Sequence, residues 1–418
     1  MKVFKFGGFS VSSAANIKQL VNIVKLNKDS QILIVVSAMG KTTDALEALS
    51  YAYNNRHDNT FQLLNGIKSY HESIMMELFG TEQHPIFDEI ANTFIEIEWM
   101  LEDEPHPDHD FSYDQIVSVG ELLSSKIISA YLKECSLDNK WLDARSYIHT
   151  DNTYKEGIID WVKTKNSIDA LKSLNGYQII ISQGFIGGTS ENFTTTLGRE
   201  GSDYSAAVFA SCLNAESLTV WKDVPGIMNA DPALFSNAQK YERLPYSEAL
   251  ELAYYGANII HPKTVKPLQN SGISLYVKPF LNPDESGTKI DGHAKLNSDI
   301  PAIILKKNQI LLTVSTKDFS YMDENLLSIL LHGLAEAHIK QNMMQLSALS
   351  VSLSVDRDEA KLRKLISSLS DTFEFSDISD LSLLTILHFK SGDIESYTAG
   401  KSVLLEQFSK NKAQLILQ

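Results

Sequence analysis

Short apolar runs separated by longer amphipathic stretches dominate the first two-thirds of the chain. The runs, rich in Val, Ile and Leu, predict buried parallel strands at residues 2–6, 31–36, 140–142, 178–181, 218–221 and 273–277. Between them, apolar residues recur at helical spacing, as at Ile17, Leu20, Val21 and Val24 after a capping Ser12 or Ser13. This alternation predicts an α/β fold with a mainly parallel sheet between helices.

Residues 45–131 carry an almost continuous helical pattern, with polar breaks at 54–59 and 102–110. The second break, EDEPHPDHD, contains carboxylates and histidines of the kinds that bind metals. Pro105 and Pro107 disrupt any ligand spacing there, so the stretch is interpreted as a solvated loop and no metal site is predicted.

The pattern becomes simpler from about residue 302 onward, where the glycine-rich loops stop. ILLTVSTKD predicts a strand, residues 324–340 a helix, LSALSVSLSVD a strand and residues 358–368 a helix, followed by further strands and a last helix. This order resembles the βαββαβ arrangement of ferredoxin-like domains and predicts a small α+β domain.

Composition narrows the class of protein. A chain of 418 residues with 43% hydrophobic residues is long enough for two or three domains. Its net charge of −15 argues against nucleic acid as a partner. The two cysteines, Cys135 and Cys212, indicate neither a disulfide framework nor a zinc site. Without a leader or a membrane-length apolar run, we expect a cytoplasmic protein with no membrane contact.

The segment SQGFIGGTSENFTTTLGREGSDYSAA, residues 182–207, is the strongest candidate for a site. Its glycines allow close approach of the backbone to a ligand, and a predicted strand precedes it while a helix follows. The guanidinium of Arg199 suits a carboxylate or a phosphate, and the carboxylate of Asp203 suits an ammonium group. Opposite charges this close favour a zwitterion such as an amino acid.

A second group of polar residues follows other predicted strands. Lys5 and the Gly7–Gly8 turn end the first strand, and Ser37 and Thr43 follow the second. Ligands of open α/β sheets bind at this edge, and an ammonium group there can lie beside a phosphoryl group.

TTLGREGSDYSAA resembles the substrate loop of aspartate kinases, TTLGRGGSD followed by an aromatic residue, a hydroxyl residue and two alanines. The similarity extends to KFGG, SVGE, WKDVPGI and GANIIHP. It implies an amino-acid-kinase fold over residues 1–292 and regulatory tandem ACT domains over residues 300–418. The first ACT module, about 308–376, would be inserted in the second, about 300–307 plus 377–418, so that the segment near Ile303 pairs with strands from Leu381 onward.

The resemblance implies ATP-dependent phosphorylation of the side-chain carboxylate of L-aspartate to 4-phospho-L-aspartate, with Mg²⁺, as the first step of lysine, threonine and methionine synthesis. The acceptor carboxylate has a pKa of about 4 and is already ionised at neutral pH, so no general base is needed. The site then has to hold two anions together and neutralise the charge of the transferred group.

The same resemblance assigns residues to roles. Catalytic roles fall to Lys5, Arg199 and Asp203. Substrate binding is implied for Ser37, Thr43, Glu121, Arg199 and Asp203, where Arg199 clamps the α-carboxylate while Glu121 and Asp203 take the ammonium group. Nucleotide binding is implied for Lys5, Gly7, Gly8, Ser10, Lys222, Asp223, Met228, Asp231 and Asn258.

Departures from the family pattern concentrate on the nucleotide side. Phe9, Lys222 and Met228 stand where the family has Thr, Thr and Tyr, and Ala233 and Asn258 stand where Arg and Lys are usual. These losses motivate an alternative, a degenerate protein that only senses an amino acid. A different acceptor, such as glutamate, acetylglutamate, carbamate or UMP, is the other alternative.

The predicted regulatory segment also departs from the family pattern. Asn342 and Ala348 replace an Asp and a Glu that can hold a lysine effector in lysine-inhibited relatives. We therefore expect weak or absent inhibition by lysine, with threonine inhibition or a purely dimer-forming role as the remaining options. The ACT modules imply a homodimer and allow a higher oligomer.

Overall fold

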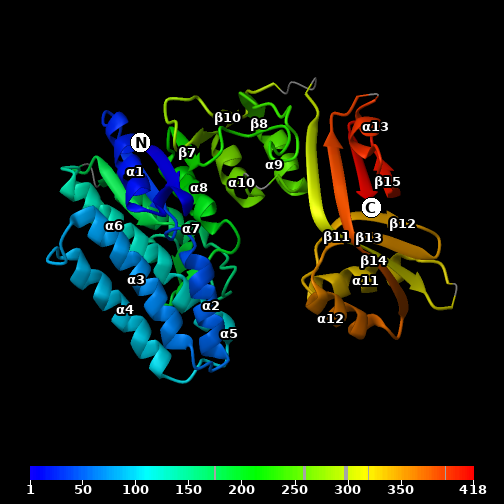
Figure 1. The fold of residues 1–418 in the computed structure, drawn as a ribbon, viewed down its shortest axis with the longest axis horizontal. Helices are drawn as coiled ribbons and strands as arrows, with labels where there is room; N and C mark the ends of the chain where they lie inside the picture. The colour runs from blue at the N-terminus through cyan, green and yellow to red at the C-terminus, as the bar shows by residue number, and fades with distance from the viewer. Residues whose placement is uncertain (174–175, 258–259, 296–299, 319, 391) are drawn as a thin grey trace. The chain divides into compact units, whose positions relative to one another are not determined.

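The computed structural model describes residues 1–173, 176–257, 260–295, 300–318, 320–390 and 392–418. It divides into two compact units. The first comprises Met1–Ile227, Lys240–Leu250 and Ile259–Leu296, and the second comprises Met228–Gln239, Glu251–Asn258 and Asn297–Gln418. Figure 1 shows the elements of both units.

An eight-stranded sheet forms the centre of the first unit. In chain order its strands are β1 (Lys2–Phe6), β2 (Ile32–Val36), β3 (Asn139–Leu142), β4 (Ile179–Gln183), β7 (Ser217–Lys222), β8 (Arg243–Pro245), β9 (Ser274–Pro279) and β10 (Thr288–Asp291). Their spatial order is β3-β4-β2-β1-β7-β9-β10-β8, parallel from β3 to β9, with β10 antiparallel to β9. All six predicted strands are confirmed. The two added strands, β8 and β10, are too short to leave a periodic signal.

Helices cover both faces of this sheet. In chain order they are α1 (Ala14–Leu26), α2 (Thr42–Asn54), α3 (Thr60–Phe79), α4 (Ile86–Glu102), α5 (His109–Val117), α6 (Val119–Glu134), α7 (Trp161–Asp169), α8 (Gly201–Leu213) and α10 (Pro262–Ser271). A further helix, α9 (Tyr246–Tyr255), begins among residues of the first unit and ends among residues of the second. The predicted helical stretch 45–131 thus separates into α2 to α6, and both predicted breaks are confirmed. Ser13 caps α1 by accepting a hydrogen bond from the Asn16 N–H at 3.2 Å.

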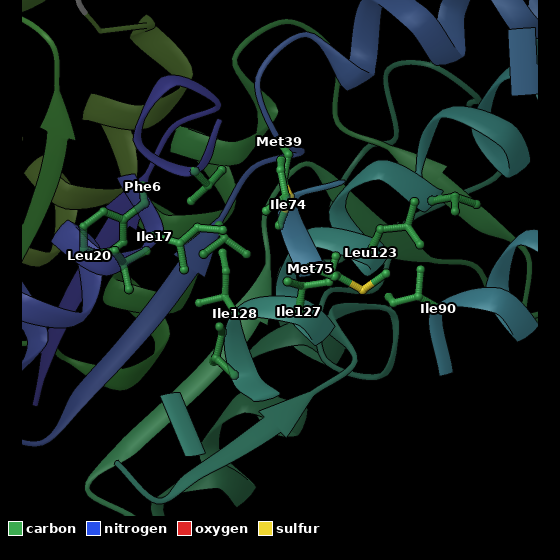
Figure 2. Close-up of a cluster of buried hydrophobic side chains, with 14 of the residues drawn as sticks. Phe6, Ile17, Leu20, Met39, Ile74, Met75, Ile90, Leu123, Ile127 and Ile128 are labelled. Atoms are coloured by element: carbon green, nitrogen blue, oxygen red, sulfur yellow. The ribbon is translucent and has the colours of Figure 1, made fainter. Parts of the chain in front are cut away.

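Side chains alternate between the two faces of the parallel strands. Phe6, Ile34 and Ile181 belong to a core with α1, α3, α4 and α6, and Figure 2 shows Ile17, Leu20, Ile74, Met75, Ile90, Leu123, Ile127 and Ile128 of those helices within it. The intervening residues, such as Val35, face the side against which α8 packs. Burial on both faces explains why these strands are almost wholly apolar.

The second unit is built on one antiparallel sheet of six strands. The strands are β11 (Ala302–Thr316), β12 (Gln341–Leu346), β13 (Ser350–Asp356), β14 (Phe373–Leu387), β15 (Val403–Phe408) and β16 (Lys412–Leu417), in the order β12-β13-β11-β14-β16-β15. The helices are α11 (Glu324–Glu336), α12 (Glu359–Leu369) and the short α13 (Asp393–Thr398). The order β11-α11-β12-β13-α12-β14 is the predicted βαββαβ arrangement, and the predicted pairing near Ile303 is confirmed, because Ile303 lies opposite Ile386.

Three predictions for this unit were wrong in detail. The predicted strand LSALSVSLSVD begins within β12 and turns at residues 347–349 before β13, so that β12 and β13 form a hairpin. The predicted helix 324–340 ends at Glu336. The last helix, α13, is followed by two more strands. Among the described residues, no helix is both long and apolar enough to cross a bilayer.

Candidate active site

A cavity of about 1090 Å³ lies at the carboxyl end of the parallel strands in the first unit. Its walls come from the loops after β1 and β2, from α2 and α6, and from the loop before α8. Five predicted site residues line it, namely Gly8, Ser37, Thr43, Glu121 and Arg199. Segments far apart in the sequence therefore meet at one polar site.

Glu121 is the most deeply buried acidic group of the cavity wall, with only 2% of its surface exposed. The first turn of α6 carries it, and its Oε1 accepts a hydrogen bond from the Ala38 N–H at 3.2 Å. Its Oε2 is buried without a hydrogen-bond partner. Burial raises the pKa of Glu121 to about 8, although the Ala38 N–H favours its charged form. A cationic group in the cavity would satisfy the unpaired oxygen and stabilise the carboxylate.

Lys5, Asp203 and Lys222 form a buried ion-pair cluster at the ends of β1, β7 and the start of α8. The Nζ of Lys5 lies 2.6 Å from Oδ1 of Asp203, and the Nζ of Lys222 lies 3.4 Å from Oδ2. Burial opposes ionisation of Asp203, but the two ammonium groups hold the pKa of its carboxyl below the ordinary value. One carboxylate thus pairs with two ammonium groups.

Arg199 lies in the loop between β6 (Thr194–Thr196) and α8, where it lines the cavity while remaining exposed. Close backbone approach fixes this region. A Cβ on Gly184 would lie 2.6 Å from Cβ of Ser202, so only glycine fits after β4. The loop can therefore present Arg199 beside the buried Asp203 without a bulky side chain behind it.

The glycine turn after β1 lies against the loop after β2. The carbonyl oxygen of Gly8 accepts a hydrogen bond from the Gly40 N–H at 3.0 Å, and a Cβ on Gly8 would lie 2.8 Å from the Gly40 oxygen. The hydroxyl of Ser10 is buried and donates to the Trp221 carbonyl oxygen at 3.4 Å. The Cβ position of Gly7 is 3.4 Å from Nζ of Lys5. Gly7 thus lies close to the lysine, while Gly8 contacts the loop after β2 and Ser10 contacts the end of β7.

The structure brings only some of the remaining residues predicted to bind the nucleotide to the site. Lys222 joins the ion-pair cluster, and Asp223 is exposed in the turn that follows β7. Met228 and Asp231 belong to the second unit, where Oδ1 of Asp231 accepts a hydrogen bond from the Ala233 N–H at 2.9 Å. Asn258 lies outside the described residues. For these last three residues a role at the nucleotide stays a prediction.

The residues present fit the phosphates of a nucleotide. Two ammonium groups, those of Lys5 and Lys222, lie beside a glycine turn at the carboxyl edge of the sheet, which is the arrangement that binds phosphate in α/β proteins. Within the described part of the chain, no three His, Cys, Asp or Glu side chains gather as a metal site.

Sequence reasoning missed two acidic residues at the site. Asp114 on α5 is fully buried and accepts hydrogen bonds from the Lys155 N–H at 3.0 Å, the Thr196 N–H at 2.9 Å and the Thr196 hydroxyl at 2.7 Å. Burial raises its pKa to about 6 despite these bonds. It ties β6, and so the loop of Arg199, to α5. Glu200 lines the cavity itself. No spacing or motif marks Asp114, because its partners are distant in sequence.

Comparisons with known proteins agree with this geometry. The model of the amino acid kinase family matches residues 1–279. The lysine-sensitive aspartokinase 3 of Escherichia coli is 31% identical over 358 residues, which cover 85% of this chain and 78% of the relative. The chain belongs to the amino acid kinase family, among its aspartokinases. An aspartokinase of Chlamydia trachomatis is 33% identical over 74% of this chain and 69% of its own.

Other aspartokinases are longer or have been solved with ligands. The chloroplastic bifunctional aspartokinase/homoserine dehydrogenase 1 of Arabidopsis thaliana is 33% identical over 69% of this chain, which spans only 32% of that relative. E. coli aspartokinase III in complex with aspartate and ADP matches all of this chain and 96% of its own, with a TM-score of 0.86 and 26% identity. Its complex with lysine and aspartate gives a TM-score of 0.82 and 27% identity. The predicted fold class is confirmed.

Proposed function

We propose that this protein is an aspartate kinase that transfers the terminal phosphoryl group of ATP to the side-chain carboxylate of L-aspartate, giving 4-phospho-L-aspartate and ADP. The observation that carries the proposal is the unpaired, buried Oε2 of Glu121 in the same cavity as Arg199. A carboxyl group that a bound ammonium group would ionise and a cationic guanidinium in one cavity suit the ammonium and carboxylate groups of an amino acid. The solved relative that binds aspartate and ADP supports the same substrates.

The residues divide the work between two halves of the site. Arg199 grips the α-carboxylate with its two-pronged guanidinium, and Glu121 accepts the ammonium group. Ser37 and Thr43 line the same cavity and position the substrate. These contacts leave the side-chain carboxylate of aspartate directed toward Lys5.

Lys5 and Lys222 neutralise charge at the point of transfer. A carboxylate oxygen of aspartate forms a bond to the γ-phosphorus while the bond from that phosphorus to the bridging oxygen of ADP breaks, and the electron pair leaves with ADP. ATP, accompanied by Mg²⁺, supplies the phosphoryl group. Lys5 stabilises the charge on the transferred oxygens, and Asp203 holds the ammonium group of Lys5 in place. No proton has to move, because the acceptor is already ionised.

We also propose that the second unit contains the regulatory ACT modules, at the predicted residues 300–418, and that it joins two copies of the chain. Exposed apolar side chains in this unit, including Leu346, Leu349 and Phe408, support an interface of that kind. Light scattering of the purified protein tests the dimer, and a monomer at micromolar concentration would contradict it.

The activity is tested by trapping the acyl phosphate with hydroxylamine in the presence of ATP and Mg²⁺. Aspartate, glutamate and buffer alone serve as parallel acceptors. We expect hydroxamate from aspartate only. Hydroxamate from glutamate instead would support the alternative of a different acceptor. Absence of product with every acceptor, in a protein that still binds an amino acid, would support the alternative of a degenerate sensor.

A further inference from the structure

Glu200 adopts a backbone conformation that side chains other than glycine rarely take. Its φ of 55° and ψ of 27° lie in the left-handed region, immediately before α8. The loop motif that this chain resembles, TTLGRGGSD, has glycine at this position. Its Oε2 is buried without a hydrogen-bond partner, and the side chain lines the active-site cavity. A strained, partly desolvated carboxylate is unfavourable unless a neighbouring charge compensates it.

Lys222, a second departure from the family pattern, supplies that neighbouring charge. It stands where the family motif WTDVPGIY has Thr. Its ammonium group lies 3.4 Å from Oδ2 of Asp203, while Lys5 occupies Oδ1 at 2.6 Å. The Asp203 N–H donates to the Glu200 carbonyl oxygen at 3.0 Å, so the backbone of Glu200 is joined to that of Asp203 at the start of α8. Two ammonium groups against the single carboxylate of Asp203 leave an excess positive charge, which the carboxylate of Glu200 cancels.

The electrostatics of Glu200 agree with this arrangement. Burial raises the pKa of its carboxyl, and among its charged neighbours Lys222 opposes that rise most strongly, ahead of Lys5 and Arg199. Asp203, the other anion of the cluster, acts in the opposite direction. The ammonium group of Lys222 therefore favours the charged form of Glu200.

We propose that Glu200 and Lys222 act as one unit, in which Lys222 is a second ammonium group that binds the nucleotide phosphates beside Lys5, and Glu200 is the positioning residue that holds it there. The inference rests on the proposed use of ATP. The proposal explains both departures from the family pattern, Glu200 in place of Gly and Lys222 in place of Thr. A threonine needs no counter-charge, whereas a second lysine beside a buried carboxylate does.

A double-mutant cycle tests the coupling through nucleotide affinity. Dissociation constants for ADP and for a non-hydrolysable ATP analogue, each with Mg²⁺, are measured by calorimetry, and KM values for ATP and aspartate are measured in parallel. Lys222→Thr should weaken nucleotide binding, because the carboxylate of Glu200 then faces the phosphates uncompensated. Adding Glu200→Gln should recover about tenfold of that loss, the size expected of directly coupled charges. The KM for aspartate should change little.

Matched variants separate charge from shape. Glu200→Asp in the Lys222→Thr background keeps the negative charge and should not rescue, and Glu200→Gly should rescue as Gln does. Glu191→Gln, an exposed glutamate of the same segment, should not rescue either. Thermal unfolding of every variant identifies any that fails to fold, and the Gln and Gly variants provide independent tests. Additive effects of Glu200→Gln and Lys222→Thr, in a protein that binds nucleotide, would overturn this inference alone. A wild-type protein that binds no nucleotide would overturn the proposed function as well.

Discussion

The ammonium group of Lys5 lies 2.6 Å from Oδ1 of Asp203, so a side chain proposed to contact phosphate already neutralises a buried carboxylate. Replacing Lys5 with alanine should lower kcat by a factor on the order of 10² to 10³, because the charge that develops during transfer loses its nearest cation. Aspartate binding should remain nearly intact, since Arg199 and Glu121 are untouched. Steady-state kinetics and calorimetry measure both.

Lys25→Ala, an exposed lysine at the end of α1, provides the control for a simple change of net charge and should have wild-type kinetics. A Lys5→Ala protein that keeps nearly full kcat would remove Lys5 from the mechanism.

Glu121 makes aspartate binding dependent on pH. Burial raises the pKa of its carboxyl from 4.5 to about 8, so the free protein holds a proton there at neutral pH. An ammonium ligand favours the charged form and expels that proton. Aspartate affinity should therefore fall as the pH drops below about 8, by up to about tenfold per pH unit. The same burial destabilises the folded state as the pH rises from 4.5 to about 8, because the folded protein holds the proton more tightly than the unfolded chain does.

Calorimetry at neutral pH in two buffers of different ionisation enthalpy measures the number of protons released on aspartate binding. We expect a release approaching one proton in the wild type and none in Glu121→Gln, whose affinity for aspartate should be weak and independent of pH. A wild-type protein that releases no proton would separate Glu121 from the ammonium group.

At this scale, motifs in the sequence predicted roles for Lys5, Glu121, Arg199 and Asp203 but not the contacts between them. The sequence predicts that Lys5 contacts phosphate and that Asp203 contacts the substrate ammonium group, whereas the structure pairs Lys5 with Asp203. That contact depends on the distance between β1 and α8, which neither segment encodes alone.

The element that positions the site is the junction of β4 with α8. A Cβ on Gly184 would lie 2.6 Å from Cβ and 2.8 Å from Cα of Ser202, so Gly184→Ala must push the start of α8 outward. We expect a loss of stability of about 1–3 kcal/mol, typical of overpacking, together with a drop in kcat/KM as Asp203 moves. Urea unfolding and kinetics measure the two effects.

Gly66 within α3 is the matched control, because nothing lies within 4 Å of its Cβ position. Gly66→Ala should leave kcat/KM unchanged and stabilise the protein by about 0.5–1 kcal/mol, as alanine does in a helix. Equal stability of the Gly184→Ala protein and the wild type would show that the junction can relax.

Elements with strong apolar patterns were predicted well, and those without such a pattern were not. Strands β1, β2, β4 and β7 were found because both of their faces are covered. The β12–β13 hairpin was missed because its turn, Ser347 to Leu349, contains neither glycine nor proline and LSALSVSLSVD reads as one run. The pairing of β12 with β13, rather than the local sequence, determines the position of that turn.

At the scale of the whole molecule, the second unit is expected to respond weakly to lysine. The side chain of Asn342 is already engaged, because its Oδ1 accepts from Nζ of Lys306 at 2.9 Å and its Nδ2 donates to Gln309 at 2.8 Å and Asp356 at 2.9 Å. The chain's own Lys306 ammonium also neutralises Asp356. A dicationic effector would therefore find its acceptors occupied, and its burial would be unfavourable.

The measurement is aspartate-kinase activity against rising lysine and threonine at a fixed, sub-saturating aspartate concentration. We expect little inhibition by lysine. Strong inhibition by lysine alone at micromolar concentration would refute this expectation. Inhibition by threonine would assign a regulatory ligand to the unit, and inhibition by neither would leave it with a purely dimer-forming role.

The sequence did not predict which segments belong to which unit. Residues 228–239 and 251–258 belong to the second compact unit although they lie among residues of the first in the chain. A long-range bond illustrates the cause, since the Ile303 N–H donates to the Asn229 carbonyl oxygen at 2.7 Å. No local sequence pattern predicts such a contact.

The two long strands β11 and β14 pair with each other along most of their lengths. The β12–β13 hairpin adds to the far half of β11, while β16 and β15 add to the far half of β14. Neither module can open without breaking the ladder that supports the other. The amide hydrogens of β11 and β14 should therefore exchange with deuterium at one common slow rate, through a single opening of the whole sheet. A conformational change caused by a ligand at one hairpin would then reach the opposite edge of the sheet, because the shared strands are rigid and no hinge separates the modules.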